Sequence, residues 1–382
     1  MQSLFIDTSD DLKQLCERLQ DSPFLAVDTE FVRERTYYPR LALIQIGNEE
    51  VAACIDPLAI DDLTPIRQLF QNPAITKVFH AASQDMEIFL FLFNELPTPS
   101  FDTQIAAAVL GIGEQIGYAN LVKEILNVDL DKSQTRTDWL QRPLATKQIR
   151  YAEDDVRYLT QMYPLIIKQL EQLDRLHWLD EDFNTLTDAR RYRPDPDKIW
   201  RKVKGVNRLK GVQLAILQAV ARWREELAMK LDRPRRRVIG DELLLDMARL
   251  KPNNLNALSK LRGISPSIVE RHGETLLTLI TAAQQQPRDQ WPALPSFVRL
   301  SAAQDAQVDA LNAIVKLCAS RYNINATNLV SRKELEKLVI GERDLPVLQG
   351  WRKHHGGEHL LAFLEGKSSL QVVDKALNLS PL

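Results

Sequence analysis

The first 145 or so residues alternate between short strand-like stretches and helix-like stretches, and strand signals become rare after that point. Apolar runs bounded by turn residues predict strands at 24–30, 41–46, 51–55 and 77–82. Apolar residues spaced by three and four predict helices at 8–20, 62–71, 84–93, 102–110 and 118–126. The turn at 47–50 joins two of the strands as a hairpin. This alternation predicts an α/β fold, in which helices flank a mixed sheet.

The rest of the chain is helical by its periodicity. Apolar residues between Tyr151 and Leu170 repeat at three and four and predict one long helix. Two stretches rich in proline and polar residues, at 190–197 and 284–295, read as linkers. These linkers divide the chain into an α/β domain at 1–195 and two all-α domains at 205–285 and 300–375.

Charge is distributed unevenly along the 382 residues, although the net charge is only −2. Residues 1–195 hold 19 basic and 32 acidic side chains, residues 196–290 hold 19 and 10, and residues 291–382 hold 11 and 9. An enzyme acting on a polyanion could use acidic groups to hold metal ions and the basic part to attract phosphates. Unequal solvation of two ordinary domains explains the same asymmetry, and charge alone does not separate these readings.

The sequence also indicates where the protein resides. No uninterrupted apolar run reaches about 18 residues, so no membrane span is expected. The first residues lack the basic and apolar segments of a signal peptide. The three cysteines, Cys16, Cys54 and Cys318, are far apart, which argues against a disulfide framework or a zinc cluster. A cytoplasmic protein is the expectation.

Asp28 and Glu30 are the first candidate metal ligands. They are separated by one residue on a predicted strand, so both side chains lie on the same face of the sheet. Two carboxylates facing the same way repel each other unless a cation lies between them, and their oxygens suit Mg²⁺ or Mn²⁺. Taken alone, the pair also fits a strand end that becomes polar as it reaches solvent.

Asp85 is the second candidate. A strand is expected to end near Ala82 and a helix to begin near Ser83, with Ser83 as its N-cap. That boundary places Asp85 in the first helical turn. A carboxylate in that turn is stabilised by the helix dipole, so a capping role without metal is also open.

Tyr151 and Asp155 are the third candidate pair. Their spacing of four residues places them on one face of the long helix. The carboxylate could bind a metal while the phenol orients a water molecule beside it. A solvated acidic turn next to a core tyrosine is the alternative, and Glu153 and Asp154 fit that description.

The complete set is more specific than its parts. The pattern Asp-x-Glu on a strand, Asp in a later helix and Tyr-x3-Asp on a further helix resembles the DEDD exonuclease superfamily. Tyr151 marks its tyrosine branch, since position 150 holds arginine rather than the histidine of the other branch. The segments VDTEFVR (27–33), TYYP (36–39) and LDKSQTRTDWLQRPL (130–144) are similar to the ribonuclease D family. The segment 261–277 within the first helical domain resembles an HRDC domain, and 300–375 a second, divergent one.

The resemblance implies a ribonuclease H-like α/β domain followed by two HRDC-type domains, and a 3′–5′ exoribonuclease that releases nucleoside 5′-monophosphates. Asp28, Glu30 and Asp155 would hold the metal that activates water, and Asp28 would also bridge to a second metal supported by Asp85. Tyr151 would orient the water, because a phenol is a poor base at neutral pH. The expected cofactors are therefore two divalent ions, Mg²⁺ or Mn²⁺.

Substrate contacts are also expected. His80 and Phe31 lie close in sequence to the candidate ligands, although each also fits a core residue. Lys132 and Arg136 lie in a segment that resembles the family and could reach phosphates. Basic residues at 201–210 and 233–237 could contact the RNA backbone. The resemblance implies RNA with a single-stranded 3′ end as substrate, including tRNA precursors and small structured RNAs, and we expect a monomer.

Two other functions remain open at this stage. A 3′–5′ DNA exonuclease would use the same chemistry, and the sequence does not show the contact to a 2′-hydroxyl that would distinguish RNA. A non-catalytic RNA-binding protein could retain the fold. The presence of all five candidate catalytic residues argues against that last reading.

Overall fold

The structure is a computed structural model that describes residues 1–131, 137–294 and 299–382. By the contacts between its residues the chain forms two compact units, and each is described by itself. The first unit contains Met1–Glu30, Leu41–Ala189 and the described residues of 299–382. The second contains Phe31–Arg40 and the described residues of 190–294. No helix of the described part is long and apolar enough to cross a membrane.

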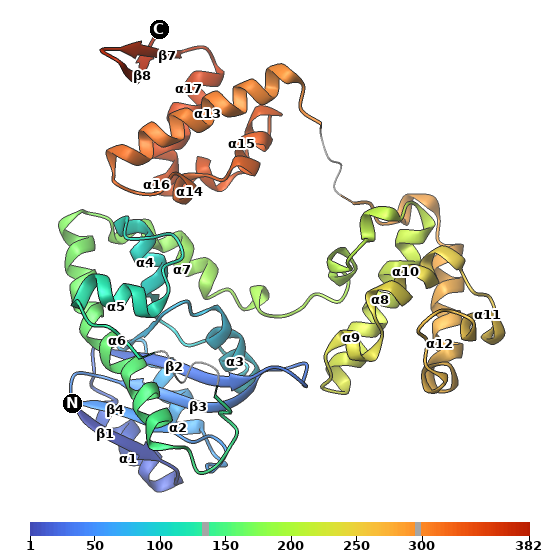
Figure 1. The fold of residues 1–382 in the computed structure, drawn as a ribbon, viewed down its shortest axis with the longest axis horizontal. Coiled ribbons are helices and arrows are strands. Elements are labelled where there is room, and N and C mark those ends of the chain that lie inside the picture. Colours follow the sequence, from blue (N-terminus) through green and yellow to red (C-terminus); the bar gives the residue numbers. More distant parts are fainter. Residues whose placement is uncertain (132–136, 295–298) are drawn as a thin grey trace. The chain divides into compact units, whose positions relative to one another are not determined.

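A six-stranded mixed sheet forms the centre of the α/β domain (Figure 1). Its strands lie in the order β1-β4-β3-β2-β5-β6. β3 and β4 are antiparallel, as expected of the predicted hairpin, and β1–β4, β2–β5 and β5–β6 are parallel pairs. β2 is a central strand and is buried along its first four residues, because helices cover it. The strands are β1 (Gln2–Ile6), β2 (Phe24–Val32), β3 (Arg40–Gly47), β4 (Val51–Ile55), β5 (Thr76–Phe79) and β6 (Ser100–Asp102).

Seven α-helices accompany this sheet in the described part of residues 1–189, and the first six match the predicted periodicity. The boundary before α3 differs from the prediction. Ser83 is the first helical residue rather than the N-cap, and the capping position is Ala82, whose side chain makes no capping hydrogen bond. Asp85 lies in the first turn of α3, as predicted. The helices are α1 (Ser9–Leu19), α2 (Thr64–Gln71), α3 (Ser83–Phe93), α4 (Thr103–Leu110), α5 (Tyr118–Leu126), α6 (Thr146–Gln172) and α7 (Asp180–Leu186).

The C-terminal segment packs on the α/β domain within the first unit. Its helices share one hydrophobic core with α4, α5 and α6. The ring of Trp178 stacks on Trp351 with centroids 4.3 Å apart, and the buried Arg175 donates to the carbonyl oxygens of Val109 and Tyr322 at 2.8 and 2.6 Å. The segment contains α13 (Ala302–Arg321), α14 (Ala326–Leu329), α15 (Arg332–Val339), α16 (Gly350–Arg352), α17 (Glu358–Leu364), and a hairpin of β7 (Ser368–Val373) and β8 (Ala376–Pro381).

Gly111 is where this packing tolerates the least extra volume. Its φ is +81°, and a Cβ atom there would lie 1.8 Å from the carbonyl oxygen of Asn323. We expect Gly111→Ala to lower the free energy of unfolding by about 3 kcal/mol, from left-handed strain of about 1 kcal/mol together with overpacking. Gly341→Ala is the matched control, because Gly341 has a φ of +99° and nothing within 4 Å of an added Cβ. Denaturant unfolding would test this, and equal losses in the two variants would contradict it.

The second unit is built around α8, which is largely buried. Trp200 and Leu244 are fully or almost fully buried in the hydrophobic core around it. Arg224, which is also buried, pairs with Asp241 at 2.8 Å and joins α8 to α10. The helices are α8 (Val212–Lys230), α9 (Arg235–Val238), α10 (Asp241–Leu250), α11 (Leu255–Ser259) and α12 (Pro266–Gln285). The helices of this unit agree with the all-α fold predicted for the middle of the chain.

Candidate active site

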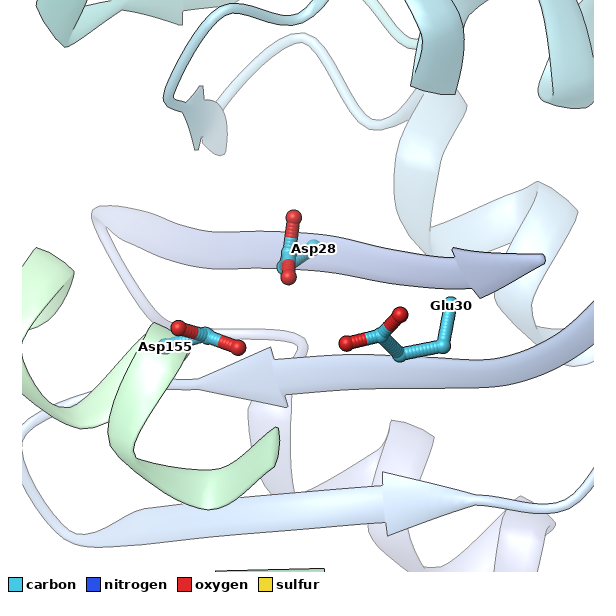
Figure 2. A group of neighbouring side chains, drawn as sticks. All are labelled: Asp28, Glu30 and Asp155. Atoms are coloured by element: carbon cyan, nitrogen blue, oxygen red, sulfur yellow. The ribbon is translucent and has the colours of Figure 1, made fainter. Parts of the chain in front are cut away.

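Three carboxylates converge where β2 passes the long helix α6. Asp28 and Glu30 project from the same face of β2, and Asp155 projects toward them from α6 (Figure 2). One oxygen of each carboxylate lies within 4.8 Å of an oxygen of the other two. The alternation of side chains along a strand places the first two, and the helix then supplies the third. The structure therefore brings together three of the four predicted metal ligands.

A cavity of about 400 Å³ opens beside these carboxylates. It receives side chains from β2, from the start of α5 and from α6, so it lies at the junction of three elements. Its volume falls in the range of small-molecule and cofactor sites. The lining residues are Asp28, Thr29, Glu30, His80, Gly117, Tyr118, Ala119, Asn120, Leu130, Asp131, Tyr151, Asp155 and Leu159.

Asp85, the fourth predicted ligand, is buried next to the group of three. Its carboxylate accepts a hydrogen bond of 2.5 Å from the hydroxyl of Thr29, the residue between Asp28 and Glu30. It lies close enough for its charge to raise the pKa of both Asp28 and Glu30. Among the described residues it belongs neither to the converging group nor to the cavity lining. Any contact between Asp85 and a bound ion is therefore less direct than for the other three.

The acidic groups carry strongly shifted pKa values. Burial raises the pKa of Glu30 to about 9, and the charges of Asp28 and Asp85 add to that shift. Burial raises the pKa of Asp85 to about 7, against the hydrogen bond from Thr29 that lowers it. The pKa values of Asp28 and Asp155 are raised well above their ordinary range, first by burial and then by neighbouring carboxylates. Buried like charges of this kind are destabilising unless protons or cations offset them.

The residues present fit a divalent metal centre. Carboxylate oxygens are the hard ligands that Mg²⁺ and Mn²⁺ prefer. The three oxygens of Asp28, Glu30 and Asp155 are close enough together to share one ion. Within the described residues this is the one such group of histidine, cysteine and acidic side chains. An ion at this place would stabilise the charged carboxylates against the burial and the mutual repulsion that raise their pKa values.

Tyr151 lies one helical turn before Asp155 and lines the same cavity. Its ring is 6.1 Å from that of Trp139, and it packs beside the buried cluster of Leu43, Leu144 and Ala152. Core residues thus contact one side of the phenol, and Tyr151 also lines the cavity. The sequence left open whether Tyr151 is a core residue or a site residue, and its surroundings have features of both.

His80 also lines the cavity and is fixed by hydrogen bonds. Its Nε2 atom lies 3.0 Å from the carbonyl oxygen of Ile116, and its Nδ1 atom lies 3.0 Å from the hydroxyl of Thr103. Burial lowers the pKa of His80, although the charge of Asp102 acts in the opposite direction. These contacts hold the imidazole in one orientation at the cavity wall, and its contact with substrate stays a prediction.

Among the described residues, Phe31 is the remaining predicted substrate contact, and the structure does not place it at the cavity. Phe31 is half-buried, belongs to the second compact unit and is absent from the described lining. Lys132 and Arg136 lie outside the residues that the structure describes.

Tyr118 is a site residue that the sequence did not single out. It begins α5, lines the cavity, and donates from its hydroxyl to the main-chain carbonyl oxygens of Asp154, at 3.0 Å, and of Asp155. This contact holds the turn of α6 that carries the third carboxylate. The sequence offered little indication of this role. An aromatic residue at the start of a helix is common, and Asp155, whose carbonyl accepts the hydrogen bond, lies 37 residues away.

Comparisons with known proteins agree with this geometry. The family model described as 3′–5′ exonuclease matches residues 4–171, and the HRDC domain model matches residues 213–280. The ribonuclease D of Gluconacetobacter diazotrophicus is 38% identical over 372 residues, which cover 97% of this chain and 94% of that protein. The chain belongs to the ribonuclease D family. The ribonuclease D of Pseudomonas paraeruginosa is 40% identical over 361 residues, 93% of this chain and 95% of the relative.

A solved ribonuclease D shares the fold. The crystal structure of Escherichia coli RNase D, described as an exoribonuclease involved in structured RNA processing, superposes with a TM-score of 0.84 and 36% identity. The match covers 96% of this chain and 99% of that one. The predicted fold class and family are thereby confirmed. As a member of the ribonuclease D family with a 3′–5′ exonuclease domain, the protein is a 3′–5′ exoribonuclease.

Proposed function

We propose that this ribonuclease D family member trims structured RNAs, tRNA precursors among them, from a single-stranded 3′ end by two-metal-ion hydrolysis. The observation that carries the proposal is the convergence of Asp28, Glu30 and Asp155 beside a cavity in an exonuclease domain. The cavity of about 400 Å³ falls in the size range of small-molecule sites, and four of the thirteen residues that line it are acidic. Release of one nucleoside 5′-monophosphate at a time suits such a site.

Each acidic residue has a distinct part in this proposal. Asp28, Glu30 and Asp155 would hold one divalent ion, and Asp28 would help to hold a second ion that Asp85, hydrogen-bonded to Thr29, would support. Such ions, when bound, stabilise the attacking and the leaving oxygen of a phosphodiester. The chain itself supplies the fixed positions, since β2, α3 and α6 hold the carboxylates before substrate arrives.

Tyr151 is assigned to the nucleophilic water. Its place one turn before Asp155 and its contacts with core residues hold the phenol at the cavity wall. We expect Tyr151→Phe to lower kcat by about 10- to 100-fold while metal binding stays unchanged, because the hydroxyl orients water and holds no ion. Single-turnover hydrolysis and metal titration would be measured on the same protein. An equal loss of metal affinity would contradict this role.

The choice of substrate follows from the family. The E. coli relative is described as acting in structured RNA processing, and its fold extends over nearly this whole chain. The alternative of a 3′–5′ DNA exonuclease uses the same carboxylates, so it differs only in the recognition of the sugar. A monomeric, cytoplasmic enzyme stays a prediction from the sequence.

The first test is hydrolysis of a 5′-labelled RNA that carries a single-stranded 3′ tail, beside a DNA of the same sequence. We expect products shortened stepwise from the 3′ end with Mg²⁺ or Mn²⁺ and none with EDTA. Equal shortening of the DNA would favour the DNA exonuclease. Binding without shortening under either metal would refute catalysis and favour an RNA-binding protein.

A further inference from the structure

A loop that follows a catalytic strand is part of the second compact unit. Residues Phe31–Arg40, which continue β2 directly after Glu30 and lead into β3, group with the described residues of 190–294. The anchor of this loop is Tyr37, which is only 8% exposed. Its hydroxyl donates to the fully buried carboxylate of Glu225 in α8. The loop is therefore built into the helical unit.

Further contacts surround this anchor. Arg235 pairs with Glu225 at 2.9 Å and places its guanidinium 5.8 Å from the ring centre of Tyr37. The main-chain N–H groups of Tyr37 and Tyr38 both donate to the carboxylate of Asp232 at 3.0 Å. The loop is thus held next to the segment that joins α8 and α9. These contacts end on one oxygen of each carboxylate, Oε1 of Glu225 and Oδ1 of Asp232.

The arginines left around this junction are exposed and uncompensated. They come in two pairs, one from the loop and one from the segment at α9, and their guanidinium groups make no ion pair in the part of the chain that the structure describes. We call them the arginine surface: Arg35, Arg40, Arg233 and Arg237. Two of the neighbouring arginines differ, because Arg235 and Arg236 are paired with Glu225 and Asp241.

The four exposed guanidinium groups of this surface favour a ligand that carries phosphates. The planar, charged guanidinium group matches the geometry of a phosphate. The aromatic residues of the loop, Phe31, Tyr37 and Tyr38, are buried or half-buried, so none presents a fully exposed ring on which a base could stack. Recognition of single-stranded RNA relies on such stacking, whereas duplex RNA presents its phosphates outward and its bases inward. The surface therefore suits the backbone of an RNA stem better than a single strand.

We propose that the arginine surface, composed of the β2–β3 loop and the α8–α9 segment and held together by Tyr37 and Glu225, binds the phosphate backbone of the double-stranded part of the substrate. This inference rests on the proposed function, since it takes the substrate to be a structured RNA. The β2–β3 loop would then recognise the double-stranded part of the RNA together with the HRDC domain, which belongs to the same compact unit.

The test uses three double variants of the full-length protein. Arg35→Ser with Arg40→Ser changes the loop, and Arg233→Ser with Arg237→Ser changes the α9 segment. Arg262→Ser with Arg271→Ser removes the same charge from exposed arginines elsewhere in the second unit. Binding to a hairpin RNA with a short 3′ tail is measured by fluorescence anisotropy in EDTA over about 50–200 mM salt, beside an unstructured RNA of equal length.

We expect each of the first two double variants to weaken hairpin binding by roughly 10-fold, with a salt dependence shallower by about 1 to 2 in logarithmic slope. The control pair should bind as the unmodified protein does. Tyr37→Phe, which removes no charge, should also weaken hairpin binding several-fold if the anchor shapes the surface. Circular dichroism is used to confirm that every variant is folded.

Three results would overturn the inference. The first is that both arginine variants bind the hairpin as tightly as the control pair does. The second is that their affinity for the unstructured RNA falls as much as their affinity for the hairpin, and the third is that Tyr37→Phe binds the hairpin as the unmodified protein does. Hydrolysis of a trinucleotide, which is too short to form a stem, separates this failure from that of the proposed function. All variants should cleave it at the unmodified rate, whereas no cleavage even by the unmodified protein would refute the proposed function itself.

Discussion

Asp28→Asn is expected to reduce hydrolysis on the order of 10³-fold or more while leaving the fold intact. Asparagine keeps the shape of the side chain but removes the anionic oxygen that the proposal shares between two ions, and metal ions contribute several kcal/mol to stabilising the transition state. Single-turnover cleavage of a tailed RNA measures the loss. Because Asp28 is half-buried among like charges, thermal unfolding without metal should occur at the same or a higher temperature.

Asp154→Asn is the matched control for this variant. Asp154 neighbours Asp155 on α6, but it is partly exposed and pairs with Arg157 at 3.4 Å. It belongs to neither the converging carboxylates nor the cavity lining among the described residues. Activity should therefore stay within about threefold of the unmodified enzyme, as for an ordinary surface ion pair. If Asp28→Asn retained activity, the assignment of Asp28 as a metal ligand would be wrong.

Stabilisation by Mg²⁺ is expected to increase with pH between about 6 and 9. The pKa of Glu30 is raised from 4.5 to about 9, and that of Asp85 from 3.8 to about 7. The metal-free folded protein thus holds protons that the unfolded chain has released, so its stability falls as pH rises through this window. Mg²⁺ must displace those protons, which becomes easier as pH rises, and its binding then adds stability.

Thermal unfolding with saturating Mg²⁺ and with EDTA, at about pH 6, 7.5 and 9, measures this effect. The difference between the two midpoints should be smallest at the lowest pH and largest at the highest. Asp28→Asn serves as the comparison, because it removes one ligand and one of the charges that raise the pKa of Glu30. A difference that is constant or shrinks as pH rises would contradict the assignment.

The carboxylate site was predictable because it depends on short-range geometry. The spacing of Asp28 and Glu30 fixes a common face of a strand, and that of Tyr151 and Asp155 fixes a common face of a helix. Contacts between residues far apart in the sequence could not be predicted from local spacing. The hydrogen bond between Thr29 and Asp85 and that between Tyr118 and the main chain of Asp155 join residues 56 and 37 positions apart.

Elements at the edges were missed for a different reason. β1 is only five residues long and its first two are exposed, and β6 has three residues, the last of which caps α4. The C-terminal hairpin turns at Asp374 and Lys375, both with positive φ, and lysine stands where the common turn signals have glycine. Short, weakly patterned strands gain their pairing from partners that periodicity does not reveal.

The first compact unit is made from three stretches of chain, and more than one hundred residues separate the last stretch from the second. The middle of the chain is in this sense an insertion, although the C-terminal segment comes last in sequence. A chain that ended before residue 299 would lack Trp351, on which Trp178 stacks. It would also lack the carbonyl oxygen of Tyr322, to which Arg175 donates. A single cut within the insertion would instead leave two fragments whose shared core holds them together. The enzyme is thus better suited to fragment complementation than to shortening from its C-terminus.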